Sequence, residues 1–428
     1  MRPFAALFRA VLLLAVVALS WAAPPERMTL ADAEVIALKN HPAIEASNFD
    51  ALATHERVSQ AHAARLPFVT ANATAVGARD DSRIAAGGLN NPIIYSRVAS
   101  GVSISQLLLD FGRTSKLIAS TKSSAAASDE HARATRADVV LSVRRAYFSA
   151  LRAESLLKVA NATVEARQLI VDQVSELVKT QLKSSLDQSF AETNLAEAKL
   201  LRSTVENDRQ GAYVELAQTL GRQSTDAFEL AEVTDPGMEP LSLQELRVLA
   251  LQRRPEIKAM RLEREAARAL AQAERAQRFP LVSATVGAGL VPNSGPNLSS
   301  DYAAVGLNVS LPFMNGGLYK ARQAEAELRA RAIGSRVSDV ENRVVRDVSA
   351  AWLDVNTARE RIGLTQKFVE QAGLSLELAQ TRYDLGLSSI VELSQAQLTK
   401  TNAEIQFVTA RYEYQLRRSV LDYQTGGL

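Results

Sequence analysis

The sequence predicts an α+β membrane protein in which each chain supplies four transmembrane β-strands and long coiled-coil α-helices. Three observations predict this fold class. The sequence contains an internal repeat, two long tracts lack proline, and four segments alternate between apolar and small polar residues. Together they indicate one structural unit used twice, so the function has to be sought in that unit.

The duplication shows as a constant spacing between matching residues. Pro42 and Pro255 stand 213 positions apart, and after a shorter loop in the second copy the spacing is 205, as between Gly221 and Gly426. Matched halves of this length indicate an internal repeat. The predicted parts are a first repeat over residues 23–221, a linker over 222–241 and a second repeat over 242–428.

The first 22 residues have the pattern of a secretory signal peptide that is cleaved after Ala22. Arg2 and Arg9 precede an apolar run, and small residues stand at Ser20 and Ala22. This run is too short to cross a bilayer, and no other stretch is longer. We therefore expect an exported chain without a transmembrane helix and, since no Cys follows the cleavage site, without a lipid anchor.

Composition excludes several classes of function. The chain has 49 Lys and Arg against 47 Asp and Glu, and the predicted leader holds two of the arginines, so the mature chain is formally neutral. A neutral chain with interspersed charges is not typical of nucleic-acid binding. There is no Cys, the 4 His form no i, i+4 pair, and no nucleophile elbow or phosphate loop is present. We expect no enzyme activity, cofactor or metal site.

Proline-free tracts predict the long helices. No proline occurs between Pro92 and Pro236 or after Pro312, and an interior proline breaks a helix. Apolar residues in these tracts recur every three or four positions, which is typical of amphipathic helices packed against one another. The two longer helices would each extend about 100 Å. The four predicted helices span residues 113–181, 186–220, 318–385 and 390–424.

Each half opens with one shorter predicted helix. Thr29 and Ser242 are followed three positions later by Asp32 and Glu245, the pattern of a capping box. We expect these side chains to accept hydrogen bonds from the first helical turn and so to fix where each helix begins.

Four segments of about ten residues have the alternation of β-strands. In the first, Val69, Ala71 and Ala73 alternate with Thr70 and Asn72. Their polar face carries Ser, Thr, Asn and Gly, which suits a narrow wet lumen, and their length matches a tilted transmembrane strand. The other three segments begin near Val98, Val282 and Ala303.

Four strands cannot close on themselves, and open strand edges are not tolerated in lipid. Copies of the chain must therefore pool their strands, and three copies would supply a barrel of about twelve. We expect a homotrimeric tube that is part membrane barrel and part helical cylinder.

Short motifs at the junctions recur in the same order in both halves. They are Arg65-Leu66-Pro67 and Arg278-Phe279-Pro280 before strands, Leu109-Asp110-Phe111-Gly112 and Phe313-Met314-Asn315-Gly316-Gly317 before the long helices, and residues 382–393 at a helix–turn–helix. In these motifs the chain resembles the TolC family of outer-membrane efflux and secretion proteins. The resemblance implies a twelve-stranded outer-membrane barrel and a helical tunnel through the periplasm. It also implies a gate at the far end that a periplasmic adaptor and an inner-membrane pump open.

The resemblance implies that the two helical turns at the tip contact the adaptor. Gln181 stands where the second turn has Gly386, and glycine is the residue that supplies a permissive backbone. We therefore expect the first turn to be tighter or more frayed. The implied contact residues are Leu182, Lys183 and Ser184 in the first turn and Gly386, Leu387, Ser388 and Ser389 in the second.

The resemblance also implies pore and gate residues. Glu392 falls where the family often has an acid facing the pore, and three copies would make a ring of negative charge; a solvated helix face is the alternative. Gln395 stands where relatives carry a second acid, which weakens a cation trap.

Asp187 and Tyr383 match positions that hydrogen-bond between neighbouring hairpins and hold the tip closed; Tyr383 could equally be a packing aromatic. Ser388 replaces an arginine that takes part in some relatives, so the closed state is held either more weakly or by Arg382.

Three functions remain open from the sequence. The first is a passive outer-membrane duct of an efflux or type I secretion system. The second is a periplasmic coiled-coil adaptor or spacer with a soluble sheet domain, and the third is an exported enzyme. The four alternating strands and the full duplication favour the duct. Loops over residues 80–91 and 291–301 should face outside, and the cargo (drug, metal ion or polypeptide) cannot be inferred.

Overall fold

The computed structural model describes residues 27–79, 96–222, 229–233, 242–292 and 299–428. The predicted signal peptide, the predicted loop over 80–91 and most of the linker and of the second loop lie outside the described residues. The chain divides into two compact units, each with residues from both halves of the sequence. One contains residues up to 44, 136–247 and 347–428, and the other contains 45–135 and 248–346.

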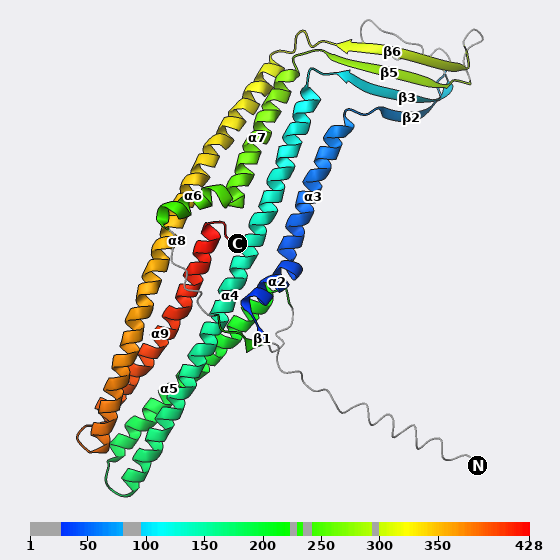
Figure 1. The fold of residues 1–428 in the computed structure, drawn as a ribbon. Helices are drawn as coiled ribbons and strands as arrows, with labels where there is room; N and C mark the ends of the chain where they lie inside the picture. Colours follow the sequence, from blue (N-terminus) through cyan, green and yellow to red (C-terminus); the bar gives the residue numbers. More distant parts are fainter. Residues whose placement is uncertain (1–26, 80–95, 223–228, 234–241, 293–298) are drawn as a thin grey trace, which may run out of the picture. The chain divides into compact units, whose positions relative to one another are not determined.

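The two halves contain the same elements in the same order (Figure 1). The long helices have 67 and 35 residues in each half, so the four predicted helices are confirmed to within two residues at each end. The repeat boundaries themselves stay a prediction. The first half has α2 (Leu30–Asn40), α3 (Pro42–Ala63), β2 (Phe68–Val76), β3 (Arg97–Leu109), α4 (Arg113–Lys179) and α5 (Ser185–Thr219). The second has α6 (Leu243–Arg253), α7 (Pro255–Ala276), β5 (Leu281–Leu290), β6 (Asp301–Ser310), α8 (Leu318–Asp384) and α9 (Ile390–Gln424).

The single short helix predicted at the start of each half is wrong, because each half has two. Pro42 and Pro255 occupy the first position of α3 and α7, where a proline ring fits without loss of a hydrogen bond. The ring restricts the preceding residue to an extended backbone, and His41 and Arg254 have ψ angles of 120° and 124°. The proline therefore ends one helix and begins the next.

The predicted helix caps are confirmed. The Asp32 amide donates to Thr29 Oγ1 over 3.2 Å, and the Thr29 amide donates back to the Asp32 carboxylate over 3.0 Å. Ser242 and Glu245 repeat both bonds at 3.3 and 2.9 Å. These hydrogen bonds hold the pKa of Asp32 and of Glu245 below the usual carboxyl values.

The four predicted strands form one antiparallel sheet in the order β2-β3-β5-β6. Its central pair, β3 with β5, joins the two halves of the sequence. The register aligns Val69 with Ile104, Ile104 with Val286 and Val286 with Val305, an apolar row across all four strands. The next row, Thr70, Ser103, Gly287 and Ala304, has small side chains on the opposite face.

The apolar face of the sheet is exposed in the single chain. Val305 is 81% exposed and Val309 is 59% exposed, far more than valines of a soluble core. On the other face Thr70 and Ser103 share a hydrogen bond of 2.6 Å between their hydroxyls. Within the described residues, none of the helices combines the length and the apolar character needed to cross a membrane.

Tyr302 lies across two glycines on the small-residue face. A Cβ atom on Gly101 would stand 2.3 Å from the Tyr302 hydroxyl, and one on Gly289 would stand 2.7 Å from the ring. The absence of side chains at these two glycines therefore lets the tyrosine ring lie flat against the sheet.

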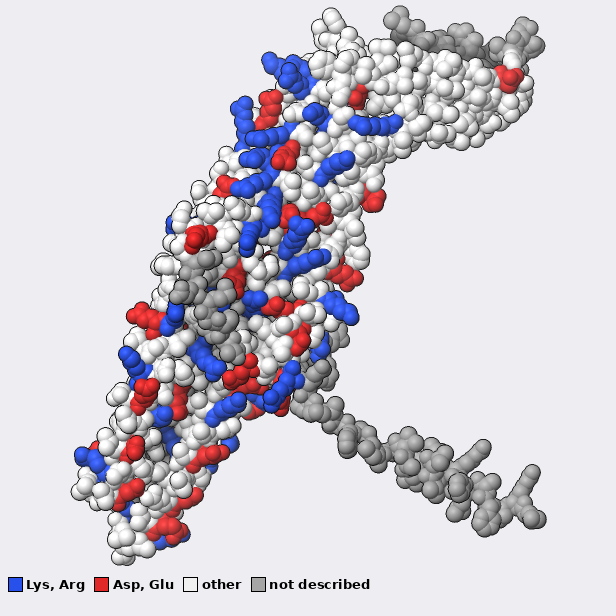
Figure 2. Space-filling view, in the orientation of Figure 1, with Lys and Arg blue, Asp and Glu red and all other residues white. Residues whose placement is uncertain are grey.

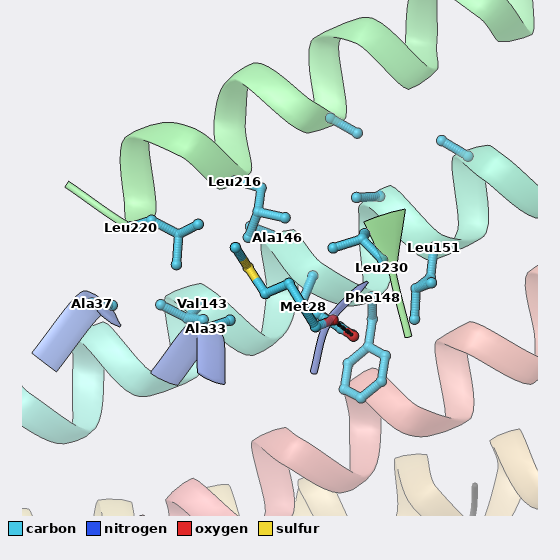
Figure 3. Close-up of a cluster of buried hydrophobic side chains, with 14 of the residues drawn as sticks. Met28, Ala33, Ala37, Val143, Ala146, Phe148, Leu151, Leu216, Leu220 and Leu230 are labelled. Carbon is cyan, nitrogen blue, oxygen red and sulfur yellow. Dashed lines mark hydrogen bonds between the residues drawn. The ribbon is translucent and has the colours of Figure 1, made fainter. Parts of the chain in front are cut away.

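The first unit has a core where α2, α4 and α5 meet two short strands, β1 (Arg27–Met28) and β4 (Glu229–Leu230) (Figure 3). The buried Tyr147 hydroxyl lies 2.9 Å from the Met28 carbonyl oxygen and 2.7 Å from that of Ala231, so its proton reaches either one. Burial, the largest cause, raises the pKa of Tyr147 to about 12. The strand pair β1–β4 connects the start of the described chain to the linker. It was not predicted from the sequence.

Polar side-chain contacts join helices within the second unit. His55 of α3 contacts Asp129 of α4 over 3.1 Å, and His131 of α4 contacts Glu263 of α7 over 2.9 Å. Arg261 of α7 pairs with Glu341 of α8 over 2.7 Å. The helices next to the sheet are thus linked in the order α3-α4-α7-α8, which repeats the order of the strands.

Candidate gate at the two helical turns

Both long helical hairpins reverse through five residues, 180–184 between α4 and α5 and 385–389 between α8 and α9. Gln181 has a φ of 60° and Gly386 a φ of 72°, so the two turns use the same left-handed conformation. The Leu182 and Leu387 amides donate to the carbonyl oxygens of Leu177 and Arg382 over 2.9 and 2.7 Å. The expectation of a tighter or more frayed first turn is therefore wrong, because Gln181 accepts a strained backbone instead.

The third residue after each turn is an acid, but the two acids are used differently. The Asp187 carboxylate accepts from the Ser184 amide over 3.1 Å and from the Ser184 hydroxyl over 2.9 Å. Glu392, which is one methylene longer, instead pairs with Arg382 over 3.2 Å. The acid of the first turn caps its own helix, whereas that of the second turn binds the helix that precedes it.

Tyr383 packs inside the tip. Its side chain is 2% exposed, in a cluster that holds residues of α4, α5, α8 and α9. The hydroxyl has no hydrogen-bond partner in the described part of the chain. Burial, helped by the charges of Asp187 and Asp384, raises the pKa of Tyr383.

The expected hydrogen bond between Asp187 and Tyr383 is not formed within the chain. Asp187 is occupied by Ser184, and the shielded Tyr383 hydroxyl would need the tip to rearrange before it met an acceptor. A role of this pair in holding the gate therefore stays a prediction.

Lys183 of the first turn stands over the Tyr383 ring of the second, with its Nζ 4.1 Å from the ring centre. This cation–π contact joins the two hairpins. Sequence reasoning did not find it, because the spacing of the two residues gives no sign of their proximity.

Two further bonds between the hairpins were also missed. Gln173 Nε2 donates to Asp384 over 3.2 Å, and Asn194 Nδ2 donates to the Ser394 hydroxyl over 2.7 Å. Single amides on long polar helices are too common for the sequence to distinguish them.

The remaining predicted tip residues lie on the surface. Leu182 and Leu387 are 71% and 67% exposed, an unusual position for two leucines. Ser389 accepts a hydrogen bond from the Glu392 amide over 3.4 Å, and the Ser388 hydroxyl is shielded without a partner in the described chain. Gln395 is exposed one turn beyond Glu392.

Among the described residues, no group of three or more His, Asp or Glu side chains is arranged to hold a metal ion. The site contains one ion pair, one cation–π contact and two serine caps around a buried tyrosine, an arrangement suited to reversible packing.

Comparison with known proteins identifies the family to which the chain belongs. The model of the outer membrane efflux protein family matches residues 35–222 and 246–427. The outer membrane protein TolC of Salmonella enteritidis is 23% identical over 91% of this chain and 80% of its own. The outer membrane protein OprJ of Pseudomonas aeruginosa is 25% identical over 92% and 82%.

Solved structures share the fold. CusC superposes with a TM-score of 0.81 at 20% identity, covering 95% of this chain and 94% of its own. The outer membrane protein VceC of Vibrio cholerae has a TM-score of 0.80 at 19% identity, covering 93% and 96%. These relatives are channel proteins rather than enzymes. The chain thus belongs to the outer membrane efflux protein family and is an outer-membrane efflux channel of the TolC type.

Proposed function

We propose that the chain is the exit duct of a tripartite efflux or type I secretion system. It acts as a homotrimer whose passive channel is gated at the helical tip by a periplasmic adaptor and an inner-membrane pump. The single observation that carries this proposal is the exposed apolar face of the four-stranded sheet, opposite a face of small and polar residues. A soluble adaptor or spacer, the alternative, would have charged residues on an exposed sheet face.

The two edges of the sheet support the trimer. Within the described chain, β2 and β6 each pair on one side only. Unpaired backbone groups are costly in lipid, so β6 of one copy would pair with β2 of the next. Three copies would close a barrel of about twelve strands.

Exposed apolar side chains on the outer helices of the same unit support lateral contacts between copies. Phe49 and Leu52 on α3 are 61% and 60% exposed, and Leu328 on α8 is 62% exposed. Helix α3 precedes the edge strand β2 and α8 follows the edge strand β6, so pairing of these strands would bring the side chains together. Their burial would stabilise the assembly by the hydrophobic effect.

The gate would be a population shift between two packings of the hairpins. The polar contacts at the tip include the Arg382–Glu392 ion pair and the Lys183–Tyr383 contact. An exposed ion pair such as Arg382–Glu392 contributes only about 1 kcal/mol or less. An adaptor bound at Leu182 and Leu387 could therefore shift the equilibrium with modest differential affinity, and the pump would supply the energy of transport.

Ion preference tests the gate. We would record single-channel currents of the purified protein in planar bilayers, comparing wild type with Glu392→Gln and Arg382→Gln. If the pair lines the constriction, Glu392→Gln leaves an unpaired arginine and shifts preference toward anions, and Arg382→Gln shifts it toward cations. Arg343→Gln, which breaks an ion pair with Asp339 elsewhere on α8, is the matched control.

The outcomes separate the proposals. Equal ion preference in all four proteins would remove the pair from the pore. Folded protein that never inserts or conducts would contradict the duct and favour the periplasmic spacer.

A further inference from the structure

The junction between the sheet and its helices carries a belt of apolar side chains. Phe313 and Met314 are 92% and 88% exposed, and Phe111 stacks on Phe279 with ring centres 5.5 Å apart. Aromatic residues gather where a membrane meets water. The belt therefore marks the level at which the lipid tails would end.

Three exposed arginines lie immediately beyond this belt, and each is held by a neutral side chain. Arg65 donates to the Ser115 hydroxyl over 2.6 Å, and Arg278 donates to Gln323 Oε1 over 3.2 Å. Arg322 donates to Gln277 Oε1 over 3.4 Å. No ion pair of these three arginines occurs in the described chain, so their charges are positioned but not neutralised.

Arginines of the other compact unit are different. Arg361 pairs with Glu413 over 2.8 Å, Arg417 with Asp354 over 3.0 Å and Arg411 with Glu232 over 3.1 Å. Carboxylates were thus available as partners in this sequence. No carboxylate of the described chain pairs with Arg65, Arg278 or Arg322, which leaves room for an external anion.

The acids nearest the belt have other partners. Asp110 accepts from the amides of Gly112 and Thr114 over 3.1 and 2.6 Å. Glu325 pairs with Arg329 over 2.6 Å, and Glu274 accepts from Gln277 over 2.5 Å. Glu274 reaches Arg322 only through that amide, so none of these acids neutralises the three arginines directly.

We propose that Arg65, Arg278 and Arg322 form a collar that binds the phosphate groups of anionic phospholipids in the adjoining leaflet. The proposal rests on the proposed function, in which the sheet crosses the membrane. Figure 2 shows the sheet as a surface almost free of charged residues, with Lys and Arg gathered on the helices beside it. A guanidinium group presents several donors in a plane, a geometry that suits phosphate oxygens, and each arginine uses one nitrogen on its neutral partner.

The experiment measures lipid binding by the full-length mature protein in detergent. Short-chain phosphatidylglycerol is titrated, and the rise in melting temperature gives an apparent affinity. We expect the triple variant Arg65→Gln, Arg278→Gln, Arg322→Gln to lose about fivefold in affinity for each arginine, about a hundredfold in all. The control, Arg361→Gln, Arg411→Gln, Arg417→Gln, changes the net charge equally and should bind like wild type.

Two further arms separate the sources of the phosphate and the causes of failure. Inorganic phosphate at the same concentration should not raise the melting temperature; if it does so as strongly as the lipid, the collar is an anion site and not a lipid site. The variant Arg65→Lys, Arg278→Lys, Arg322→Lys keeps the charge and should retain most of the binding. If the triple Gln variant does not fold, the three single variants Arg65→Gln, Arg278→Gln and Arg322→Gln replace it, each with an expected loss of about fivefold.

Equal lipid affinity in the collar and control variants would overturn the proposal. The duct itself is tested separately by channel formation in bilayers of neutral lipid. A protein that conducts there but shows no preference for phosphatidylglycerol contradicts the collar alone, and one that never conducts contradicts the duct.

Discussion

The two helical turns at the tip have one backbone design and two sets of side chains. Both contain five residues, a left-handed second position and a serine cap. In the first turn Ser184 and Asp187 bond to each other locally, and Lys183 reaches across to the Tyr383 ring. In the second turn the contacts reach outward, because Tyr383 and Leu393 are buried in the cluster shared with the other hairpin.

The difference teaches how a duplicated unit can divide its tasks. The positions equivalent to Tyr383 and Leu393 are Val178 and Gln188. The first turn is therefore stabilised by its own caps, while the second is stabilised by its neighbour. A gate needs such a pair, since a turn with few local contacts can change its packing when the neighbour moves.

The largest effect is expected from Leu393→Ala. Leu393 is fully buried, so its truncation should destabilise the tip by about 2–5 kcal/mol. Gln188→Ala at the equivalent position should cost no more than about 0.5 kcal/mol. Hydrogen exchange of α9 and α5 peptides measures both. Equal protection loss in the two variants would mean that the turns share one packing role.

Exchanging the residues at the left-handed positions should have opposite effects. A Cβ on Gly386 would meet nothing within 4 Å, so Gly386→Ala should cost about 1 kcal/mol from the backbone alone. Gln181→Gly should remove strain of similar size from the first turn, partly offset by the entropy of glycine. Melting temperatures of the two variants check the signs. Destabilisation by Gln181→Gly would show that its side chain has a role of its own.

Removal of the caps should destabilise the first turn more than the second. This is the reverse of the order expected for Leu393→Ala and Gln188→Ala. Ser184→Ala loses a reciprocal capping box and should cost about 1 kcal/mol, whereas Ser389→Ala loses one long bond and should cost about 0.5 kcal/mol. Exchange rates of the first-turn amides of α5 and α9 measure this. A larger effect at Ser389 would contradict the division between local and shared contacts.

A pH effect should be confined to the second turn and to alkaline solution. The folded state raises the pKa of Tyr383, so this contribution to stability is complete below about pH 10 and is lost as the pH rises through the raised pKa. Val178 gives the first turn no such dependence. Exchange of α9 peptides should accelerate above about pH 10 in wild type and not in Tyr383→Phe. Equal acceleration in both proteins would assign the alkaline loss to another group.

Much of the local structure followed from the sequence. Absence of proline marked the long helices, alternation marked the strands, and Thr29 with Asp32 marked a cap, because each depends on neighbours along the chain. Pro42 and Pro255 mark the points where the short helical segments divide into two helices, but the sequence analysis predicted one helix in each half.

The hydrogen-bond and ion-pair partners of the acids at the tip could not be predicted from the sequence in this way. Asp187 and Glu392 occupy equivalent positions after equivalent turns, yet one binds its own cap and the other binds Arg382. The resemblance implied a bond to Tyr383 for Asp187 and a pore-facing position for Glu392, and neither observed partner was predicted. Side-chain length and the nearness of Arg382 on the preceding helix decided the outcome.

The sequence by itself determined the repeated order of helices and strands, the two faces of the sheet and the family, since periodicity and spacing are properties of the chain. Only the tertiary structure decided that β3 pairs with β5 across the two halves, that Tyr383 is buried without a partner, and that Lys183 covers its ring. The physical reason is that these contacts join residues far apart in sequence. Their formation depends on which faces of the packed helices and strands meet.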